Sequence, residues 1–273
     1  MGGDEHGGML LGKNTPVVDA YAPQLLFPIP RARGRHALGV TGVLPFHGID
    51  VWHAYELSWL DHTCKPVARV GRLCVPASSP NMVESKSLKL YFNSLNNTCF
   101  GSEAELVRTV RVDIAAVAGA PVELELLDVC DPRLAGSVPP GDCLDDLEFT
   151  PVAGDPRAEL LETGEQYAAQ TFYSHLLRSL CPVTGQPDWA TVWLSYGGPR
   201  LCAPSLLSYI VAYRRHQEFH EQCIERMFCD IQARCRPRFL HVQGCYTRRG
   251  GLDISPFRST DPQAAPLPRL NRQ

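Results

Sequence analysis

Several patterns that mark common classes of protein are missing from this chain of 273 residues. It contains no GxGxxG and no GxxxxGKS/T segment, so neither a Rossmann dinucleotide site nor a P-loop is expected. No apolar run approaches the roughly 18 residues needed to cross a bilayer. The formal net charge is only -3, which gives no reason to expect a nucleic-acid-binding surface. We therefore expect no membrane partner and no direct nucleic-acid partner.

Cysteine is plentiful, with 11 residues, but no two of them form a CxxC pair. The first residues, Met1 to His6, carry early acid and no apolar core, so no secretory signal is expected. Without export, the thiols are most simply read as reduced, which favours a cytoplasmic protein. A hydrophobic content of 44% with 20% charged residues is typical of a globular chain.

Irregular segments rich in proline and glycine divide the chain. Residues 1–45 are expected to form an N-terminal arm. Residues 131–154, with several prolines and an acidic run, are expected to link a first module, 46–130, to a second module, 155–273. The second module ends in an irregular C-terminal arm.

The two modules resemble each other in their helical patterns. SLKLY opens an apolar-periodic stretch at residue 87, and SLLSY opens another at residue 205. Each stretch has room for two helices. A Gly-Ser start at 101–102 should divide the first pair, and the polar segment 214–220 should divide the second.

Strand-like segments flank these helices. Residues 170–180 and 189–196 are rich in aromatic and β-branched side chains, with a turn at 181–188 between them. Residues 239–246 predict another strand, followed by a turn at 248–251. We predict an α+β fold in which each module runs ββααββ, with an antiparallel sheet and its helices on one face.

Cys181 stands at one end of the turn between two predicted strands, and Asp188 stands at the other end. A hairpin brings both ends of its turn to the same edge, so the thiol and the carboxyl can face one pocket. A cysteine nucleophile needs thiolate character, and its reaction usually needs a proton delivered nearby. The spacing alone leaves open a buried small side chain beside an ordinary turn carboxylate.

Phe219, His220 and Glu221 lie at the predicted break between the helices of the second module. Side chains at such a break can point into a cleft. Glu221 can accept two parallel hydrogen bonds, which suits an amidine-like edge such as that of guanine, and His220 can hold or relay a proton near neutral pH. The alternative is a solvated polar helix face.

A metal site is not expected. His216 and His220 lie near Cys223, but Ile224 stands where an HExxH motif would need its second histidine. We interpret Cys223, Cys229 and Cys235 as packing residues, because their spacing does not keep them on one helical face.

Residues 83–91 of the first module place a carboxylate, two hydroxyls and two lysines around a predicted helix start. Ser85 and Ser87 can cap exposed backbone N–H groups, and the positive helix end with Lys86 and Lys89 favours an anion such as phosphate. A capped amphipathic helix without a ligand remains the alternative.

Together these segments resemble the NADPH-dependent 7-cyano-7-deazaguanine reductases, the nitrile reductases of queuosine biosynthesis. The segment that carries the resemblance best is ESKSLKLY at 84–91. LPFHG at 44–48, QPDW at 186–189, EFHEQC at 218–223 and YTRRGGLDI at 246–254 support it. The resemblance covers nearly the whole chain and matches the long form of the family, which has two modules.

The resemblance implies a tunnelling fold (T-fold) of two tandem ββααββ modules and a homodimer. It also implies reduction of the nitrile of 7-cyano-7-deazaguanine to the primary amine, 7-aminomethyl-7-deazaguanine, for tRNA modification. The resemblance further implies that two NADPH molecules are consumed per turnover and that no metal is involved. A nitrile accepts hydride poorly until a nucleophile adds to its carbon and its nitrogen gains a proton.

By the same resemblance, Cys181 matches the nucleophile that forms a covalent thioimide, and Asp188 matches the proton donor. His220 and Glu221 match a substrate-binding pair, with His220 also a catalytic candidate. Further substrate-binding positions are Val83, Glu84 and Ser85, and Phe219 is expected to stack on the base. The positions that match NADPH contacts are Ser85, Lys86, Arg249 and Gly250.

The chain departs from the family at some positions. SPFR at 255–258 stands where the family usually reads NPWR, which puts detail of the cofactor site in question. Cys64, Cys74 and Cys99 lie where the family does not lead us to expect cysteine. Two other functions remain as alternatives: a zinc-dependent cyclohydrolase, against which the missing ligand set argues, and a purine-binding module without catalysis.

Overall fold

The structure is a computed structural model that describes residues 18–273. The first part of the predicted N-terminal arm, 1–17, lies outside the described residues. The chain divides into two compact units, and neither is one continuous segment. The first unit contains the described part of Met1–Arg33, together with Val51–Leu134 and Arg248–Asp253, and the second contains Gly34–Asp50, Ala135–Thr247 and Ile254–Gln273.

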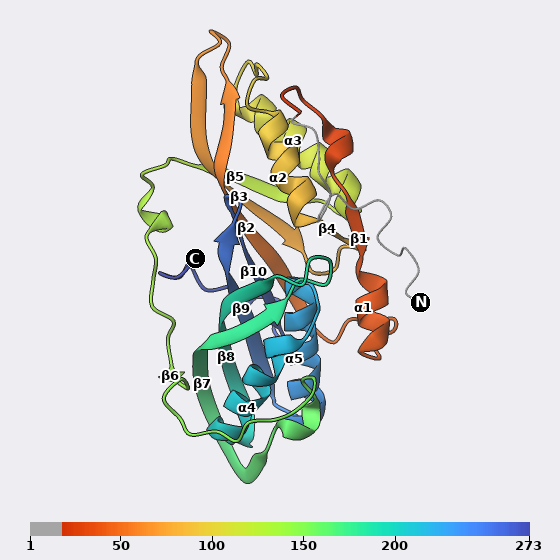
Figure 1. Cartoon of the computed structure of the whole chain (residues 1–273), viewed down its shortest axis with the longest axis vertical. Coiled ribbons are helices and arrows are strands. Elements are labelled where there is room, and N and C mark those ends of the chain that lie inside the picture. The colour runs from red at the N-terminus through yellow and green to blue at the C-terminus, as the bar shows by residue number, and fades with distance from the viewer. Residues whose placement is uncertain (1–17) are drawn as a thin grey trace. The chain divides into compact units, whose positions relative to one another are not determined.

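The first unit holds an antiparallel sheet with helices on one face (Figure 1). Its strands run in the order β5-β3-β2-β10, and a separate two-stranded sheet pairs β1 with β4. The elements are η1 (Pro23–Leu25), β1 (Pro28–Pro30), β2 (His47–Leu60), β3 (Pro66–Pro76), β4 (Asn81–Val83), α2 (Ser85–Ser94), α3 (Glu103–Ala118), β5 (Glu123–Leu127) and η2 (Pro132–Leu134).

The second unit repeats this arrangement with longer strands (Figure 1). Its strands run in the order β2-β10-β9-β8-β7-β6, antiparallel except for the short parallel pair of β6 with β7. The elements are α1 (Arg31–Ala37), β6 (Asp142–Cys143), η3 (Ala158–Leu160), β7 (Thr163–Leu180), β8 (Pro187–Leu201), α4 (Ala203–Ala212), η4 (Tyr213–Arg215), α5 (His220–Cys235), β9 (Phe239–Arg249) and β10 (Leu252–Ser259).

The predicted α+β class with a mostly antiparallel sheet is confirmed. The second half of the chain follows the expected order, β7-β8-α4-α5-β9-β10. The first half differs, because only β5 follows its two helices before the irregular stretch, and the next strand, β6, pairs with β7 in the second unit. Part of the segment predicted as an arm, 18–45, holds η1, β1 and α1.

The helices begin and end where the sequence places capping groups. The Ser102 hydroxyl accepts a hydrogen bond from the backbone N–H of Glu105 at the start of α3, and Gly119 ends this helix in the left-handed conformation. Leu106, Val110 and Ile114, spaced by one helical turn, are fully buried, so α3 packs one apolar stripe into the core of its unit. Both predicted helix pairs, divided at 101–102 and at 214–220, are confirmed.

Four charged side chains are buried together in the second unit. Arg35 forms two hydrogen bonds to the Glu225 carboxylate, at 2.8 and 2.9 Å, and Arg258 reaches both Glu225, at 2.9 Å, and Asp50, at 2.8 Å. The Phe46 ring lies 5.5 Å from each of the two guanidinium groups. We call Arg35, Asp50, Glu225 and Arg258 the ion network; it connects α1, β2, α5 and β10 with two charges of each sign.

The glycine of the LPFHG segment is required by close packing. Gly48 has φ of +155°, and a Cβ built on it would lie 2.0 Å from the carbonyl oxygen of Phe257 on β10. Gly39, at φ +71°, has no such neighbour within 4 Å.

Gly48→Ala should therefore lower the free energy of unfolding by about 3 kcal/mol, because it adds a steric clash to the backbone strain. Gly39→Ala carries only the strain and should cost about 1 kcal/mol. Denaturant unfolding of both variants checks this. Equal losses in the free energy of unfolding would mean that the backbone around the Phe257 carbonyl moves to accommodate the added methyl group.

Within residues 18–273, no helix is long and apolar enough to cross a membrane.

Candidate active site

The turn between β7 and β8 holds Cys181 and Asp188 at its two ends, as predicted. The N–H of Cys181 donates to the Gln186 carbonyl, and the N–H of Gly185 donates to the Cys181 carbonyl, both at 2.9 Å, which closes the turn. Asp188 pairs across the hairpin with Ser179. Cys181 is 7% exposed and Asp188 4%, so both residues are largely removed from water.

A main-chain connection brings the start of α5 to the same place. The N–H of Leu180, the residue before Cys181, donates to the His216 carbonyl at 2.8 Å, and Leu180 forms a parallel bridge with Gln217. Helix α5 then begins at His220. The end of β7 and the start of α5 are therefore fixed to each other by backbone hydrogen bonds rather than by side chains alone.

His220 is held between two partners. Its Nε2 lies 3.4 Å from Oδ2 of Asp188, and its ring lies 4.1 Å from the ring of Tyr246 on β9, tilted by 40°. Glu221, in the first turn of α5, is 5% exposed. The structure thus brings Asp188 and His220 into contact at one corner of the second unit, beside Cys181, Phe219 and Glu221.

Sequence reasoning missed the polar layer behind this pair. The hydroxyls of Ser179 and Tyr246 and the thiol of Cys223 are buried near one another. Burial raises the pKa of Tyr246 and that of Cys223 well above their usual values, so both groups stay protonated at neutral pH. Tyr246 therefore supports His220 with its ring and presents a neutral hydroxyl; Ser179 and Tyr246 lie on strands, where the pattern marks only a buried face.

The residues predicted from the first module gather in the first unit. Val83 ends β4, which pairs with β1, and Glu84 follows it as the N-cap of α2. The Glu84 carboxylate accepts hydrogen bonds from the backbone N–H groups of Lys86, at 2.8 Å, and Ser87, at 2.7 Å. The expectation that Ser85 and Ser87 cap this helix is wrong, because Glu84 takes that role.

The Ser87 hydroxyl instead connects the start of α2 to the segment that contains Phe27. It donates to the Glu84 carbonyl at 2.7 Å and accepts from the N–H of Phe27 at 3.0 Å. Burial raises the pKa of Glu84, although the N–H groups of Lys86 and Ser87 oppose this shift. A carboxyl that is 1% exposed and preorganised in this way is suited to recognise a donor group of a ligand.

The predicted cofactor residues lie on α2 and on the turn between β9 and β10, both in the first unit. Gly250 and Gly251 form this turn with φ of +56° and +79°. A Cβ on Gly250 would lie 2.9 Å from Cδ of Lys89, so the side chain of α2 crosses directly over the turn. A Cβ on Gly251 would lie 2.4 Å from Cδ of Glu56, so side chains of this unit pack closely on both glycines.

Basic side chains surround this glycine turn. The Lys89 ammonium is 3.7 Å from the Glu56 carboxylate, and the Arg248 guanidinium lies 4.5 Å from the centre of the Tyr55 ring. The Tyr55 hydroxyl in turn donates to Asp253 at 2.5 Å. Together with Lys86 and Arg249, these cations suit the phosphate groups of a dinucleotide, so the residues present fit NADPH.

The positions that depart from the family lie on the part of β10 that belongs to the second unit. Ser255 is buried, and its Oγ accepts a hydrogen bond from the Gln273 side chain at 2.8 Å. Phe257 is also buried, and its ring stacks against His241 with the centroids 6.3 Å apart. Both residues therefore serve packing within their unit.

His216 is committed to carboxylates instead of a metal set. Its ring nitrogens lie 3.0 Å from Glu218 and 3.2 Å from Asp155. Among the described residues, no group of three or more His, Cys, Asp or Glu side chains is arranged to hold a metal ion. Cys223 and Cys235 are buried, in agreement with a packing role.

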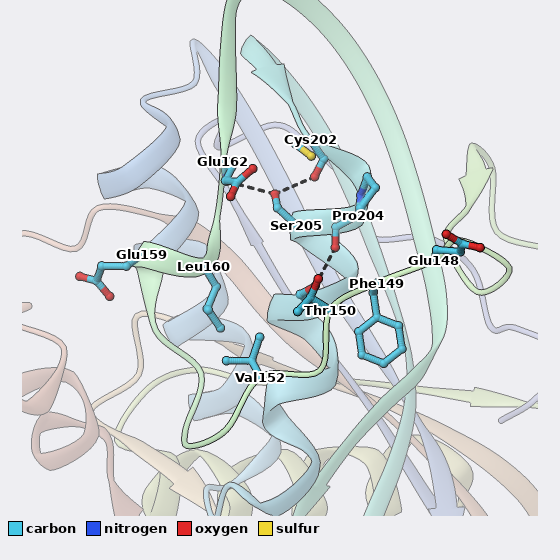
Figure 2. A pocket seen from close by; sticks show the side chains of 11 residues that line it. Glu148, Phe149, Thr150, Val152, Glu159, Leu160, Glu162, Cys202, Pro204 and Ser205 are labelled. Carbon is cyan, nitrogen blue, oxygen red and sulfur yellow. Dashed lines mark hydrogen bonds between the residues drawn. The ribbon is translucent and has the colours of Figure 1, made fainter.

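A pocket of about 510 Å³ in the second unit is separate from these residues (Figure 2). It lies beside the start of α4, where the Ser205 hydroxyl donates to the Cys202 carbonyl and accepts from the Glu162 N–H. Glu148 and Glu159 also line the pocket, so its lining is negatively charged. None of the predicted site residues contributes to this lining.

Comparison with known proteins gives family models and curated relatives that this chain matches. Residues 17–126 match the family model described as nitrile reductase, 7-cyano-7-deazaguanine-reductase N-term, and residues 187–265 match the model of a QueF-like protein. Curated relatives named NADPH-dependent 7-cyano-7-deazaguanine reductase include proteins of Chromohalobacter salexigens, Dechloromonas aromatica and Acinetobacter baumannii.

These relatives are similar over almost their whole length. The first is 49% identical, over 96% of this chain and 96% of the relative. The second is 51% identical, over 94% and 92%, and the third is 50% identical, over 97% and 98%. The chain belongs to the family of NADPH-dependent 7-cyano-7-deazaguanine reductases.

Proposed function

We propose that this protein reduces the nitrile of 7-cyano-7-deazaguanine to the primary amine, 7-aminomethyl-7-deazaguanine, with two NADPH per turnover. The observation that supports the proposal is the contact of His220 with Asp188, which follows the turn that begins at Cys181. It occurs in a chain about half identical to reductases of this name.

In the proposed reaction, the Cys181 sulfur adds to the nitrile carbon and a proton reaches the nitrile nitrogen from Asp188. The product is a covalent thioimide. This addition turns an unreactive triple bond into an acceptor for hydride, so that one difficult reduction becomes two easier ones. His220, in contact with Asp188, is placed to return protons to this carboxyl between steps.

When bound, the cofactor would supply two hydrides: the first would convert the thioimide to an imine with release of the Cys181 thiolate, and the second, with a proton, would convert the imine to the amine. Ser85 and Lys86 on α2, with Arg249 and Gly250 on the glycine turn, would hold it in the first unit. The cations would bind its phosphates. The burial of Cys181 and Asp188 keeps bulk water from an imine that would otherwise hydrolyse.

Carboxylates would recognise the base. Glu221 and Glu84 are both buried, and each can accept hydrogen bonds from the N–H donors of a deazaguanine. In the second unit, His220 and Phe219 are proposed to bind the base, with Phe219 stacked on it. Val83 and Ser85 of the first unit are further proposed substrate-binding residues.

The proposal also covers the fold, the assembly, the location and the pathway of the protein. We propose that the two units form a tunnelling fold, although only the second half of the chain runs ββααββ, and that the protein assembles as a homodimer. The protein would act in the cytoplasm, without a metal, on a free base destined for queuosine in tRNA. The boundaries 1–45, 46–130, 131–154 and 155–273 stay predictions.

The decisive experiment mixes the protein with 7-cyano-7-deazaguanine and NADPH and follows the NADPH absorbance. We expect oxidation that depends on the nitrile and stops at two NADPH per nitrile consumed. The amine product is identified by mass. Absence of nitrile-dependent oxidation, with bound nitrile demonstrated by calorimetry, would contradict the proposed reaction and favour a binding module.

Asp188→Asn should lower kcat by about 10²–10⁴-fold, because the amide keeps the shape of the carboxyl but cannot deliver its proton. Binding of the nitrile, measured by calorimetry, should change little. The matched control is Asp146→Asn, an exposed aspartate of the same unit, which should leave kcat unchanged. A loss of affinity at unchanged kcat would assign Asp188 to binding instead.

A further inference from the structure

Two exposed cysteines of the first unit lie side by side. The sulfur atoms of Cys64 and Cys99 are 3.6 Å apart, close enough for one thiol to donate a hydrogen bond to the other. Both side chains are exposed to solvent, and the two residues are 35 positions apart in the chain. Neither belongs to the site described above, and the sequence had marked both only as departures from the family.

The backbone holds Cys64 in place. It lies in the turn between β2 and β3, with φ of +63°, and its N–H donates to the Asp61 carbonyl at 2.9 Å. The Asp61 carboxylate accepts from the N–H groups of Thr63 and Lys65, at 2.8 and 3.1 Å. These bonds close the turn and direct the Cys64 side chain from a fixed position.

The backbone also holds Cys99. The N–H of Leu60, at the end of β2, donates to the Thr98 carbonyl at 3.0 Å, and the N–H of Phe100 donates to the Leu60 carbonyl at 2.9 Å. Cys99 is therefore bridged to β2 between these two bonds. The contact between the thiols follows from main-chain pairing of the β2 end with the connection from α2 to α3, and does not depend on two flexible side chains meeting by chance.

We propose that Cys64 and Cys99 form a reversible redox pair, which a peroxide oxidises to an intramolecular disulfide. The peroxide first converts one thiol to a sulfenic acid and releases one water. The second thiol then attacks this sulfur, forms the S–S bond and releases another water. Two electrons pass from the sulfur atoms to the peroxide, and a dithiol reductant reverses the reaction.

Cys64 and Cys99 are better placed to react with a peroxide than the buried cysteines of the first unit and of the candidate active site. Cys74, Cys181 and Cys223 are buried, which limits the access of an oxidant. At Cys64 and Cys99 the resolving thiol is already in contact, so the sulfenic acid is captured before further oxidation. The disulfide would close a loop that contains β3, β4 and α2, and so restrain the helix whose N-cap is Glu84.

The test treats the full chain with a small excess of hydrogen peroxide and maps its peptides without reduction. We expect one linked pair of peptides containing Cys64 and Cys99, the loss of two hydrogens from the intact mass, and reversal by dithiothreitol. Cys64→Ser and Cys99→Ser should each abolish the link. Cys130→Ser, which changes another exposed thiol of the same unit, should retain it.

Thermal unfolding provides a second measurement. Closure of this loop should raise Tm by about 5 °C in the wild type and leave Cys64→Ser unchanged. An unchanged Tm in the linked protein would overturn the proposed restraint. Equal alkylation of Cys64 and Cys99 before and after peroxide treatment, or a link to a different cysteine, would overturn the pair itself; neither result depends on the nitrile reaction.

Discussion

Replacing Cys181 with alanine should abolish nitrile reduction, with kcat reduced by at least about 10³-fold, because no other group of the site replaces a covalent nucleophile. Base recognition should survive, since the carboxylates and His220 remain. Intact mass after incubation with the nitrile alone should show one adduct on the wild type and none on Cys181→Ala. Calorimetry should still detect nitrile binding to the variant.

The matched control is Cys143→Ala, which removes an exposed thiol from the same unit and should keep both the adduct and the rate. An adduct that survives Cys181→Ala would transfer the nucleophile to another of the 11 cysteines. Cys223 is poorly suited to this role, because its burial raises its pKa and keeps it a thiol.

Glu225→Gln should be the most destabilising conservative change in the second unit. Glu225 is 2% exposed and accepts hydrogen bonds from both arginines of the ion network. Its loss leaves Arg35 and Arg258 buried with Asp50 as the only remaining carboxylate of the network. Removing one partner from a buried ion network costs about 3–5 kcal/mol, which corresponds here to a fall in Tm of about 10 °C.

Glu125→Gln provides the comparison. Glu125 is paired with Arg133 at 2.7 Å, but both side chains are about half exposed, so the loss should stay below about 1 kcal/mol. Denaturant unfolding of the two variants measures the difference. Similar losses would show that water reaches the ion network and screens it.

The sequence predicted the local parts of the fold well. The hairpin with Cys181 and Asp188 at the ends of its turn is readable because alternating aromatic and β-branched residues stop at a Pro-Gly turn. The break before α5 is readable because a polar run interrupts an apolar period. The position of His220 beside Asp188 could not be predicted in the same way. It depends on the backbone hydrogen bond from Leu180 to His216, and no sequence pattern indicates that bond.

Contacts between distant segments could not be predicted. Arg35, Asp50, Glu225 and Arg258 are far apart in the chain, and each alone is typical of a solvated surface. The sequence predicts Ser85 and Ser87 as the caps of α2, because serine is among the preferred N-cap residues. In the structure the Glu84 carboxylate caps the helix by accepting hydrogen bonds from two N–H groups. The missing last strand of the first half reflects the pairing of β6 with β7.

The interleaved composition of the two units has a consequence for how the protein is made. The first unit includes Arg248–Asp253, which supplies the glycine turn under Lys89 and the Asp253 partner of Tyr55. A ribosome adds about 5–20 residues per second, so on the order of 10 s passes between the synthesis of Leu134 and that of this turn. The earlier half must wait in an unfinished state, with its sheet edge open, until the later half has been synthesised.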